Sequence, residues 1–159
     1  MAFFDPAKFT DEAVDSLKTE LTGKAIIAAS GGVDSTVAAV LAAKAVGDNL
    51  LAIYVDTGYM RLDESKFVSS MLEDLGVQHK VIDASERFYE GLKGVIDPEQ
   101  KRKIIGELFI RVFEEESKKY GGNFLVQGTI APDWIESGGG IRDTIKSHHN
   151  VGGLPDDME

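Results

Sequence analysis

Apolar residues gather along the chain in short runs that predict strands. Lys24–Ala29 and Leu50–Val55 are almost continuously apolar, which is typical of strands covered on both faces of their sheet. Two further stretches, Val77–Ile82 and Asn123–Val126, carry weaker apolar runs next to glycine or polar residues. We therefore expect four strands, the first two of them deeply buried.

Between these runs, apolar residues recur at the three- and four-residue spacing of amphipathic helices. The first such segment, Asp11–Leu21, follows Thr10, a residue type favoured as a helix N-cap. The other expected helices are Val33–Val46, ended by Gly47; Glu64–Leu75, stopped at Gly76; Ser85–Gly91; and Pro98–Tyr120, with proline in its first turn.

The order of the expected elements predicts the fold class. Strands alternate with helices, and each return to a parallel neighbour needs a right-handed crossover. We expect an α/β protein with a parallel sheet and helices on both faces, preceded by a lead-in helix within residues 1–22. After Gln127 the sequence is rich in glycine and polar residues, which predicts a long functional loop or a disordered tail.

Composition narrows the classes of protein to consider. The 159 residues suit one domain, and the formal net charge of −10 disfavours nucleic acid and anionic membranes as partners. The absence of cysteine excludes disulfides, thiolate metal sites and cysteine nucleophiles. The sequence contains no apolar stretch long enough to span a membrane and no secretory leader pattern. We expect a cytoplasmic protein.

A glycine-rich turn between the first strand and the next helix is the strongest chemical signal. Its sequence, "SGGVDST", begins at Ser30. Such a turn presents backbone N–H groups at the positive end of a helix, which favours an anion. It is neither GxxxxGK[ST] nor GxGxxG. On spacing alone, a phosphate site and a plain turn capped by Ser30 or Asp34 remain equally open.

Five motifs resemble those of a known family. "SGGVDST" resembles the SGGxDS pyrophosphate loop (PP-loop) of the N-type ATP pyrophosphatases. "VDTGYMR", "DPEQKRKIIGELF", "QGTIAPDWIES" and "IKSHHNVGGLP" resemble, in order and spacing, segments of the GMP synthetase branch of that family. The resemblance implies an adenine-nucleotide alpha-hydrolase-like (Rossmann-like) fold, with residues 23–159 forming an ATP-pyrophosphatase domain and about 128–155 a lid-like loop.

The resemblance also implies a reaction and its partners. ATP with Mg²⁺ adenylates XMP, pyrophosphate leaves, and ammonia displaces AMP to give GMP. The family's two-subunit form takes ammonia from a separate glutaminase subunit, which suits a chain without cysteine. Family members continue into a C-terminal dimerisation domain that this sequence lacks. The chain is therefore expected to be part of a longer protein that forms a homodimer.

Matching motif by motif assigns the ATP site. Ser30, Gly31, Gly32, Val33, Asp34, Ser35 and Thr36 would hold the leaving β- and γ-phosphates. We expect Asp34 to cap the helix and to lie near Mg²⁺. The backbone of Val55 could pair with the adenine edge, or Val55 could be plain strand core. Gly128 could pass close to the ribose or adenine, or simply serve a turn.

The resemblance assigns the remaining site residues to XMP and to catalysis. Arg102, His148 and His149 are expected to contact XMP, although Arg102 could instead lie on a solvated helix face. Asp133, Glu136 and Lys146 are the expected catalytic residues, with Lys146 offsetting charge at the α-phosphate. The alternatives are another ATP pyrophosphatase, such as an NAD synthetase, or a non-catalytic ATP-binding module.

Overall fold

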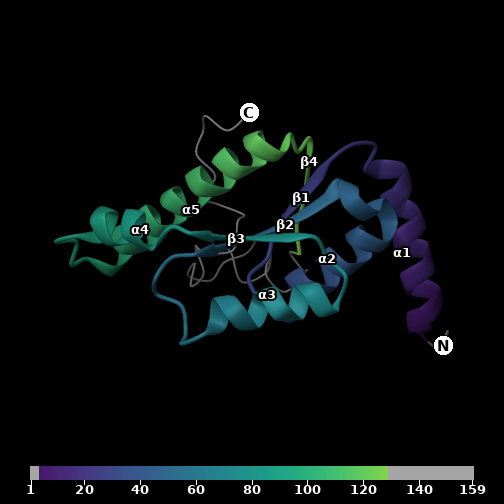
Figure 1. Cartoon of the computed structure of the whole chain (residues 1–159), viewed down its shortest axis with the longest axis horizontal. Coiled ribbons are helices and arrows are strands. Elements are labelled where there is room, and N and C mark those ends of the chain that lie inside the picture. The colour runs from purple at the N-terminus through teal and green to yellow at the C-terminus, as the bar shows by residue number, and fades with distance from the viewer. Residues whose placement is uncertain (1–3, 129–159) are drawn as a thin grey trace, which may run out of the picture.

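The computed structural model describes residues 4–128 of the chain. These residues form a four-stranded parallel sheet in the order β3-β2-β1-β4 (Figure 1). The sequence predicted all four strands, with ends that differ by one or two residues. They are β1 (Ala25–Ala28), β2 (Leu50–Asp56), β3 (His79–Asp83) and β4 (Phe124–Val126).

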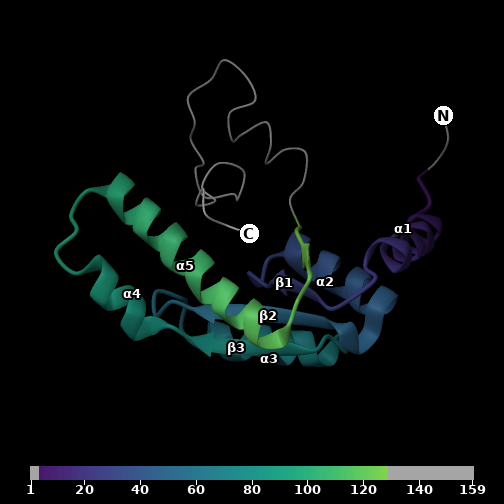
Figure 2. The same ribbon diagram turned by 90° about the horizontal axis from the view of Figure 1, so that it is seen from above.

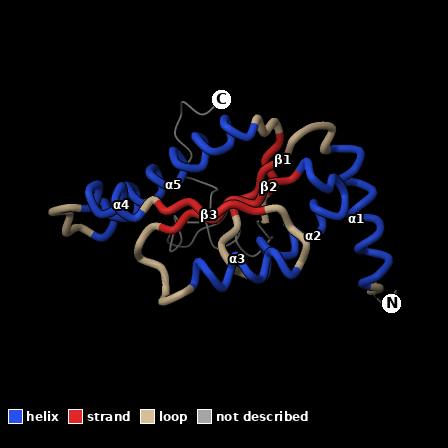
Figure 3. Tube along the Cα trace, viewed as in Figure 1, coloured by secondary structure: helices blue, strands red, loops and turns tan. Residues whose placement is uncertain are grey.

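The helices confirm the predicted alternation with the strands. They are α1 (Pro6–Glu20), α2 (Val33–Val46), α3 (Glu64–Asp74), α4 (Ser85–Leu92) and α5 (Pro98–Tyr120), and the 3-10 helix η1 lies at Gly47–Asn49. Figure 3 shows the strands running between these helices. Among the described residues, no helix is both long enough and apolar enough to cross a membrane.

The predicted start of the first helix was wrong. Helix α1 begins at Pro6, and its N-cap is Asp5, whose side chain accepts hydrogen bonds from the N–H groups of Ala7 and Lys8. Thr10 lies inside the helix, where its hydroxyl donates to the Pro6 carbonyl at 2.8 Å. Asp followed by Pro at the first helical position is a stronger start signal than Thr10, because Pro has its φ already fixed.

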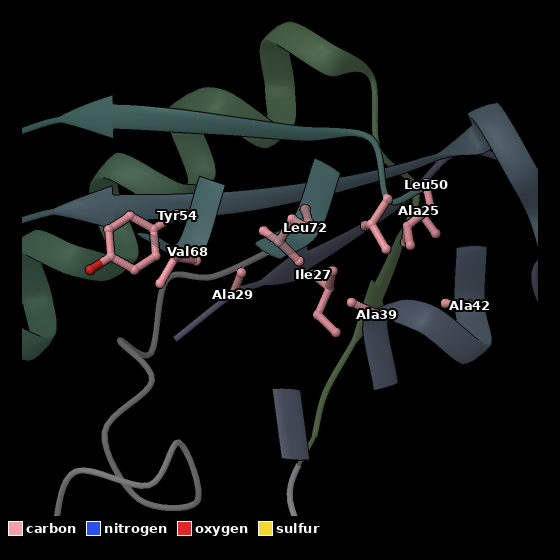
Figure 4. Close-up of a cluster of buried hydrophobic side chains, with 11 residues drawn as sticks. Ala25, Ile27, Ala29, Ala39, Ala42, Leu50, Tyr54, Val68 and Leu72 are labelled. Carbon is pink, nitrogen blue, oxygen red and sulfur yellow. The ribbon is translucent and has the colours of Figure 1, made fainter. Parts of the chain in front are cut away.

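Two apolar layers cover the sheet, as expected for helices on both faces. One layer joins alternate residues of β1 and β2, such as Ile27 and Tyr54, to α2 and α3 (Figure 4). The other, which we call the α5-side core, joins the intervening residues, such as Ile53, to Phe88 of α4 and Phe113 of α5. Figures 1 and 2 show α5 and α3 on opposite sides of the sheet. The period of two along buried strands sorts side chains into these layers.

A buried carboxylate fixes α5 against β3. The side chain of Glu116 is only 8% exposed, and it accepts hydrogen bonds from Lys80 of β3 and Lys119 of α5, each at 2.6 Å. The bonds from Lys119 and Lys80 lower the pKa of Glu116 from its ordinary 4.5, against the opposing effect of burial. Because the folded pKa is depressed, this stabilisation is complete above the unfolded value and is lost as the pH falls through the folded one.

Replacing Glu116 with Gln is therefore expected to lower the free energy of unfolding by about 1–2 kcal/mol at pH 7. Urea denaturation of both proteins from pH 7 down to pH 3 would test this, because the difference should shrink below pH 4.5. Glu115→Gln is the matched control, since Glu115 pairs with Arg87 in solvent and should change stability by less than about 0.5 kcal/mol. A difference that does not depend on pH would contradict the assigned role of Glu116.

Candidate functional site

The loops that carry the predicted ATP-binding residues meet at the carboxyl-terminal edge of the sheet. One loop follows β1 at Ser30–Gly32, a second follows β2 at Thr57–Asp63, and Gly128 follows β4. Parallel strands bring their carboxyl ends to one edge, which is where open α/β sheets bind ligands.

A compact hydroxyl network shapes the loop after β1. The Ser35 hydroxyl donates to the Gly32 carbonyl at 3.1 Å, and its oxygen lies 2.9 Å from that of Ser30. The Ser30 hydroxyl oxygen in turn accepts from the Gly32 N–H at 3.3 Å, and Thr36 donates to the Gly32 carbonyl at 2.7 Å. The hydroxyls of Ser30, Ser35 and Thr36, which were predicted to contact phosphate, thus make hydrogen bonds within the loop that stabilise its conformation.

The start of α2 is open to a ligand. The N-cap of α2 is Gly32, and no side chain makes a capping hydrogen bond there. The predicted capping by Ser30 or Asp34 was therefore wrong: Ser30 precedes the cap, and Asp34 is already the second residue of the helix. Without a capping side chain, the first N–H groups of α2 keep the partial positive charge that attracts an anion.

Two glycines let the backbone approach closely at this loop. Gly31 has a φ of +77°, and a Cβ there would lie 2.7 Å from Val68 Cγ2 on α3. A Cβ on Gly128 would lie 3.0 Å from the Ser35 nitrogen and 3.1 Å from the Asp34 carbonyl oxygen. The close approach expected of Gly128 is therefore made to the first turn of α2, and its contact with nucleotide stays a prediction.

Val55 combines a buried side chain with a backbone that faces the loop edge. Its side chain is 1% exposed and packs in the α5-side core, as the strand-core interpretation expected. The Ile53 carbonyl accepts a hydrogen bond at 2.9 Å from the N–H of Ala29, the residue that follows β1, so the backbone groups of Ile53 point toward β1. Along a strand every second residue has the same orientation, so the N–H and C=O of Val55 also point toward the β1 side of β2. The last paired residues of β1 and β2 are Ala28 and Ile53. The N–H and C=O of Val55 therefore face the space beyond the end of β1.

Arg102 lies on the exposed face of α5. Its guanidinium pairs with Glu99 at 3.0 Å, and the two side chains are 57% and 52% exposed. This is the solvated helix face of the alternative interpretation, with a carboxylate partner three residues away, and such exposed pairs add little stability. An exposed guanidinium also remains accessible to an anion, so its contact with XMP stays a prediction.

Five predicted site residues lie outside the described part of the chain: Asp133, Glu136, Lys146, His148 and His149. Their catalytic and XMP-binding roles stay predictions. Within residues 4–128, no group of three or more His, Asp or Glu side chains is arranged to hold a metal ion.

Sequence reasoning missed the turn after β2. The Asp56 carboxylate accepts from the Gly58 N–H at 2.8 Å and from the Ser65 hydroxyl. The nearby Tyr54 side chain is 1% exposed, and its hydroxyl has no hydrogen-bond partner in the described structure. Burial, followed by the charge of Glu64, raises the pKa of Tyr54, so the phenol stays neutral. The Asp-x-Gly spacing of an Asx turn was the available signal.

The four-stranded parallel sheet, with a glycine-rich loop at its carboxyl-terminal edge that suits an anion, defines an α/β protein with a candidate phosphate site. The chain belongs to the NAD synthase family, whose model matches residues 7–111. It is 53% identical over 94% of its length to the B subunit of GMP synthase (glutamine-hydrolyzing) from Thermoplasma acidophilum, and 58% identical over 98% to that from Methanocaldococcus jannaschii. The chain spans about half the length of these curated relatives, 50% and 49% respectively.

Solved structures confirm the fold. An NH3-dependent NAD synthetase from Campylobacter jejuni superposes with a TM-score of 0.65 at 16% identity, over 77% of this chain and 56% of that one. NMN synthetase from Francisella tularensis gives 0.64 at 20% identity, over 77% and 54%. At these identities the likeness supports the α/β fold alone. The resemblance to the GMP synthetase branch is instead confirmed by the sequence relatives.

Proposed function

We propose that this chain belongs to an enzyme that converts XMP to GMP. ATP adenylates XMP with release of pyrophosphate, and ammonia then displaces AMP. The observation that carries the proposal is the identity of 50–58% to proteins named as the B subunit of GMP synthase, over 93–100% of this chain. The exposed, uncapped start of α2 supports a phosphate site at this loop, as this reaction would need.

In this proposal, the loop Ser30–Thr36 holds the β- and γ-phosphates. The N–H groups of Val33 and its neighbours in the first turn of α2 face the anion, and the hydroxyls of Ser30, Ser35 and Thr36 lie beside it. Fixing the leaving pyrophosphate in one position lowers the entropic cost of the transfer. The backbone of Val55 meets the adenine edge, because its N–H and C=O point past the end of β1.

The loop is compatible with Mg²⁺ bound between protein and nucleotide. Asp34 is exposed in the first turn of α2, beside the proposed phosphate position, and makes no capping hydrogen bond there. Mg²⁺ is often bound by one or two carboxylates together with substrate phosphates, so a single Asp suffices. Bound there, Mg²⁺ would neutralise phosphate charge.

The remaining parts of the proposal concern XMP and the partners. Arg102, His148 and His149 contact XMP, while Asp133 and Glu136 act with Lys146 in adenylation. The relatives are named as one subunit of a glutamine-hydrolyzing enzyme, which supports a separate glutaminase subunit as the ammonia source. We further propose a cytoplasmic enzyme that forms a homodimer at full length.

The test is AMP release from ATP and Mg²⁺, measured with XMP and ammonium together and with each omitted. It is done on the 159-residue chain and on the full natural length. AMP that appears only with XMP, and GMP only with ammonium, would support the proposal. ATP binding without any response to XMP would instead favour the NAD synthetase alternative. That alternative is consistent with the NAD synthase family model and with the structural likeness to NAD synthetases.

Replacing Lys146 with Ala is expected to lower turnover about tenfold, with ATP affinity changed by less than about twofold. The reason is that a lysine offsetting charge at the α-phosphate acts in the transition state more than in the bound state. Steady-state kinetics and ATP calorimetry on the full natural chain would measure the two effects. Equal losses in turnover and affinity would contradict this role.

A further inference from the structure

The turn that follows the proposed adenine-binding strand is built locally at both ends. At its start, Asp56 accepts from the Gly58 N–H at 2.8 Å. At its end, Glu64 accepts from the Arg61 N–H at 2.8 Å, and the Glu64 N–H donates to the Arg61 carbonyl at 3.1 Å. These bonds shape the two ends of the turn, but they do not attach its middle to the rest of the domain.

A tyrosine from a different element reaches the middle of this turn. The Tyr89 hydroxyl, on α4, donates to the Gly58 carbonyl at 2.9 Å. The Tyr89 ring also meets that of Tyr59 edge to face, with ring centroids 5.2 Å apart and planes at 89°. Edge-to-face rings at this distance attract one another, so Tyr89 holds the turn by a polar and an apolar contact at once.

The base of α4 is itself fixed to the end of β2. The Ala84 N–H, just before α4, donates to the Asp56 carbonyl at 2.8 Å. Phe88, next to Tyr89, is completely buried in the α5-side core. The helix therefore presents the Tyr89 hydroxyl from a rigid base, at a position set by β2 itself.

The sequence of the turn fits this contact closely. Gly58 has a φ of +77°, and a Cβ there would lie 2.6 Å from Tyr89 Cζ and 2.8 Å from Ser85 Cβ. Only glycine combines this backbone conformation with so close an approach of the tyrosine. Gly58 and Tyr89 thus form one complementary pair, although 31 residues separate them.

We infer that Tyr89 is a positioning residue for the adenine end of the ATP site. The inference rests on the proposed function, in which the Val55 backbone pairs with adenine. Val55 immediately precedes Asp56, the residue from which the turn is built. By anchoring Gly58, the Tyr89 hydroxyl fixes the direction in which the chain leaves β2, and with it the turn that borders the Val55 backbone groups that adenine meets. The phosphate loop, which follows β1, does not depend on this contact.

The experiment compares two tyrosine variants in the full natural chain. Tyr89→Phe removes the hydroxyl and keeps the ring. Tyr120→Phe is the matched control, because the Tyr120 hydroxyl also donates to a backbone carbonyl, that of Asp48, at 2.9 Å, but at the amino-terminal end of β2. Calorimetry measures the binding of ATP and of inorganic pyrophosphate, each with Mg²⁺ and without XMP. Amide hydrogen exchange reports on residues 57–62.

We expect Tyr89→Phe to weaken ATP binding about fivefold, the effect of losing one hydrogen bond. Pyrophosphate binding should stay within about twofold, exchange in residues 57–62 should quicken, and Tyr120→Phe should leave both affinities within about twofold. Unchanged ATP affinity in Tyr89→Phe, or an equal loss for both ligands, would overturn the inference. An unaltered chain that binds neither ligand would be a different result, which overturns the proposed function itself.

Discussion

Replacing Gly31 with Ala is expected to weaken the binding of pyrophosphate about 100-fold. The left-handed conformation, with φ of +77°, costs an alanine about 1–2 kcal/mol. The new Cβ would also lie 2.7 Å from Val68 Cγ2, so the loop or α3 must move. We expect the free loop of the variant to relax away from this geometry, so that binding must restore it at a cost of about 3 kcal/mol in total; since each 1.4 kcal/mol is tenfold in affinity, this cost gives the loss. Calorimetry with pyrophosphate and Mg²⁺ would measure it.

Two further variants separate the two effects expected at Gly31, namely the backbone strain of the left-handed conformation and the steric clash of the new Cβ with Val68. Gly76→Ala introduces the same kind of strain, at φ of +69° with nothing within 4 Å, and Gly76 lies in the turn between α3 and β3. It should lower stability without changing affinity. Gly31→Ala combined with Val68→Ala removes the collision and should recover part of the lost affinity. If Gly31→Ala bound pyrophosphate normally, the loop would not be the phosphate site.

The order of strands and helices could be predicted because the apolar pattern along the chain and the residues that mark helix ends indicate the same elements. Val33–Val46 and Pro98–Tyr120 were predicted with their observed ends, since glycine or proline marks their boundaries. The start of β3 was less visible. Val77 was expected in the strand, but its N–H donates back to the Leu72 carbonyl at 2.9 Å and closes α3. A backbone bond of this kind leaves no mark in the pattern of side chains.

The parts of the candidate site that depend on neighbouring residues could be predicted from the sequence, and the parts that depend on distant contacts could not. The loop Ser30–Thr36 is contiguous, so its sequence alone suggested an anion site as one of two interpretations, and the family resemblance favoured it over a plain turn. The contact between Tyr89 and Gly58 joins segments 31 residues apart, and only the fold brings them together. The wrong expectation that Asp34 caps α2 has a similar cause: residue type favours a cap, but Gly32 has the extended backbone, with φ of −79° and ψ of 162°, that the N-cap position requires.

Replacing Phe88 with Ala is expected to lower the free energy of unfolding by about 3–5 kcal/mol. The side chain is fully buried, and it is the one residue of α4 that is buried. It packs with Val112 and Phe113 of α5 in the α5-side core, so its removal leaves a cavity and releases α4 from the sheet. Urea denaturation measures the loss as a lower midpoint at unchanged slope.

Phe67→Ala is the matched control, because Phe67 on α3 is 66% exposed and should change stability by less than about 0.5 kcal/mol. A loss of similar size in both variants would contradict the packing described for α4. Since Phe88 is the base from which Tyr89 reaches Gly58, Phe88→Ala should also quicken amide exchange in residues 57–62 under conditions where the protein remains folded. Helix α4 would then contribute to both the stability of the α5-side core, through Phe88, and the geometry of the turn beside the proposed adenine edge, through Tyr89.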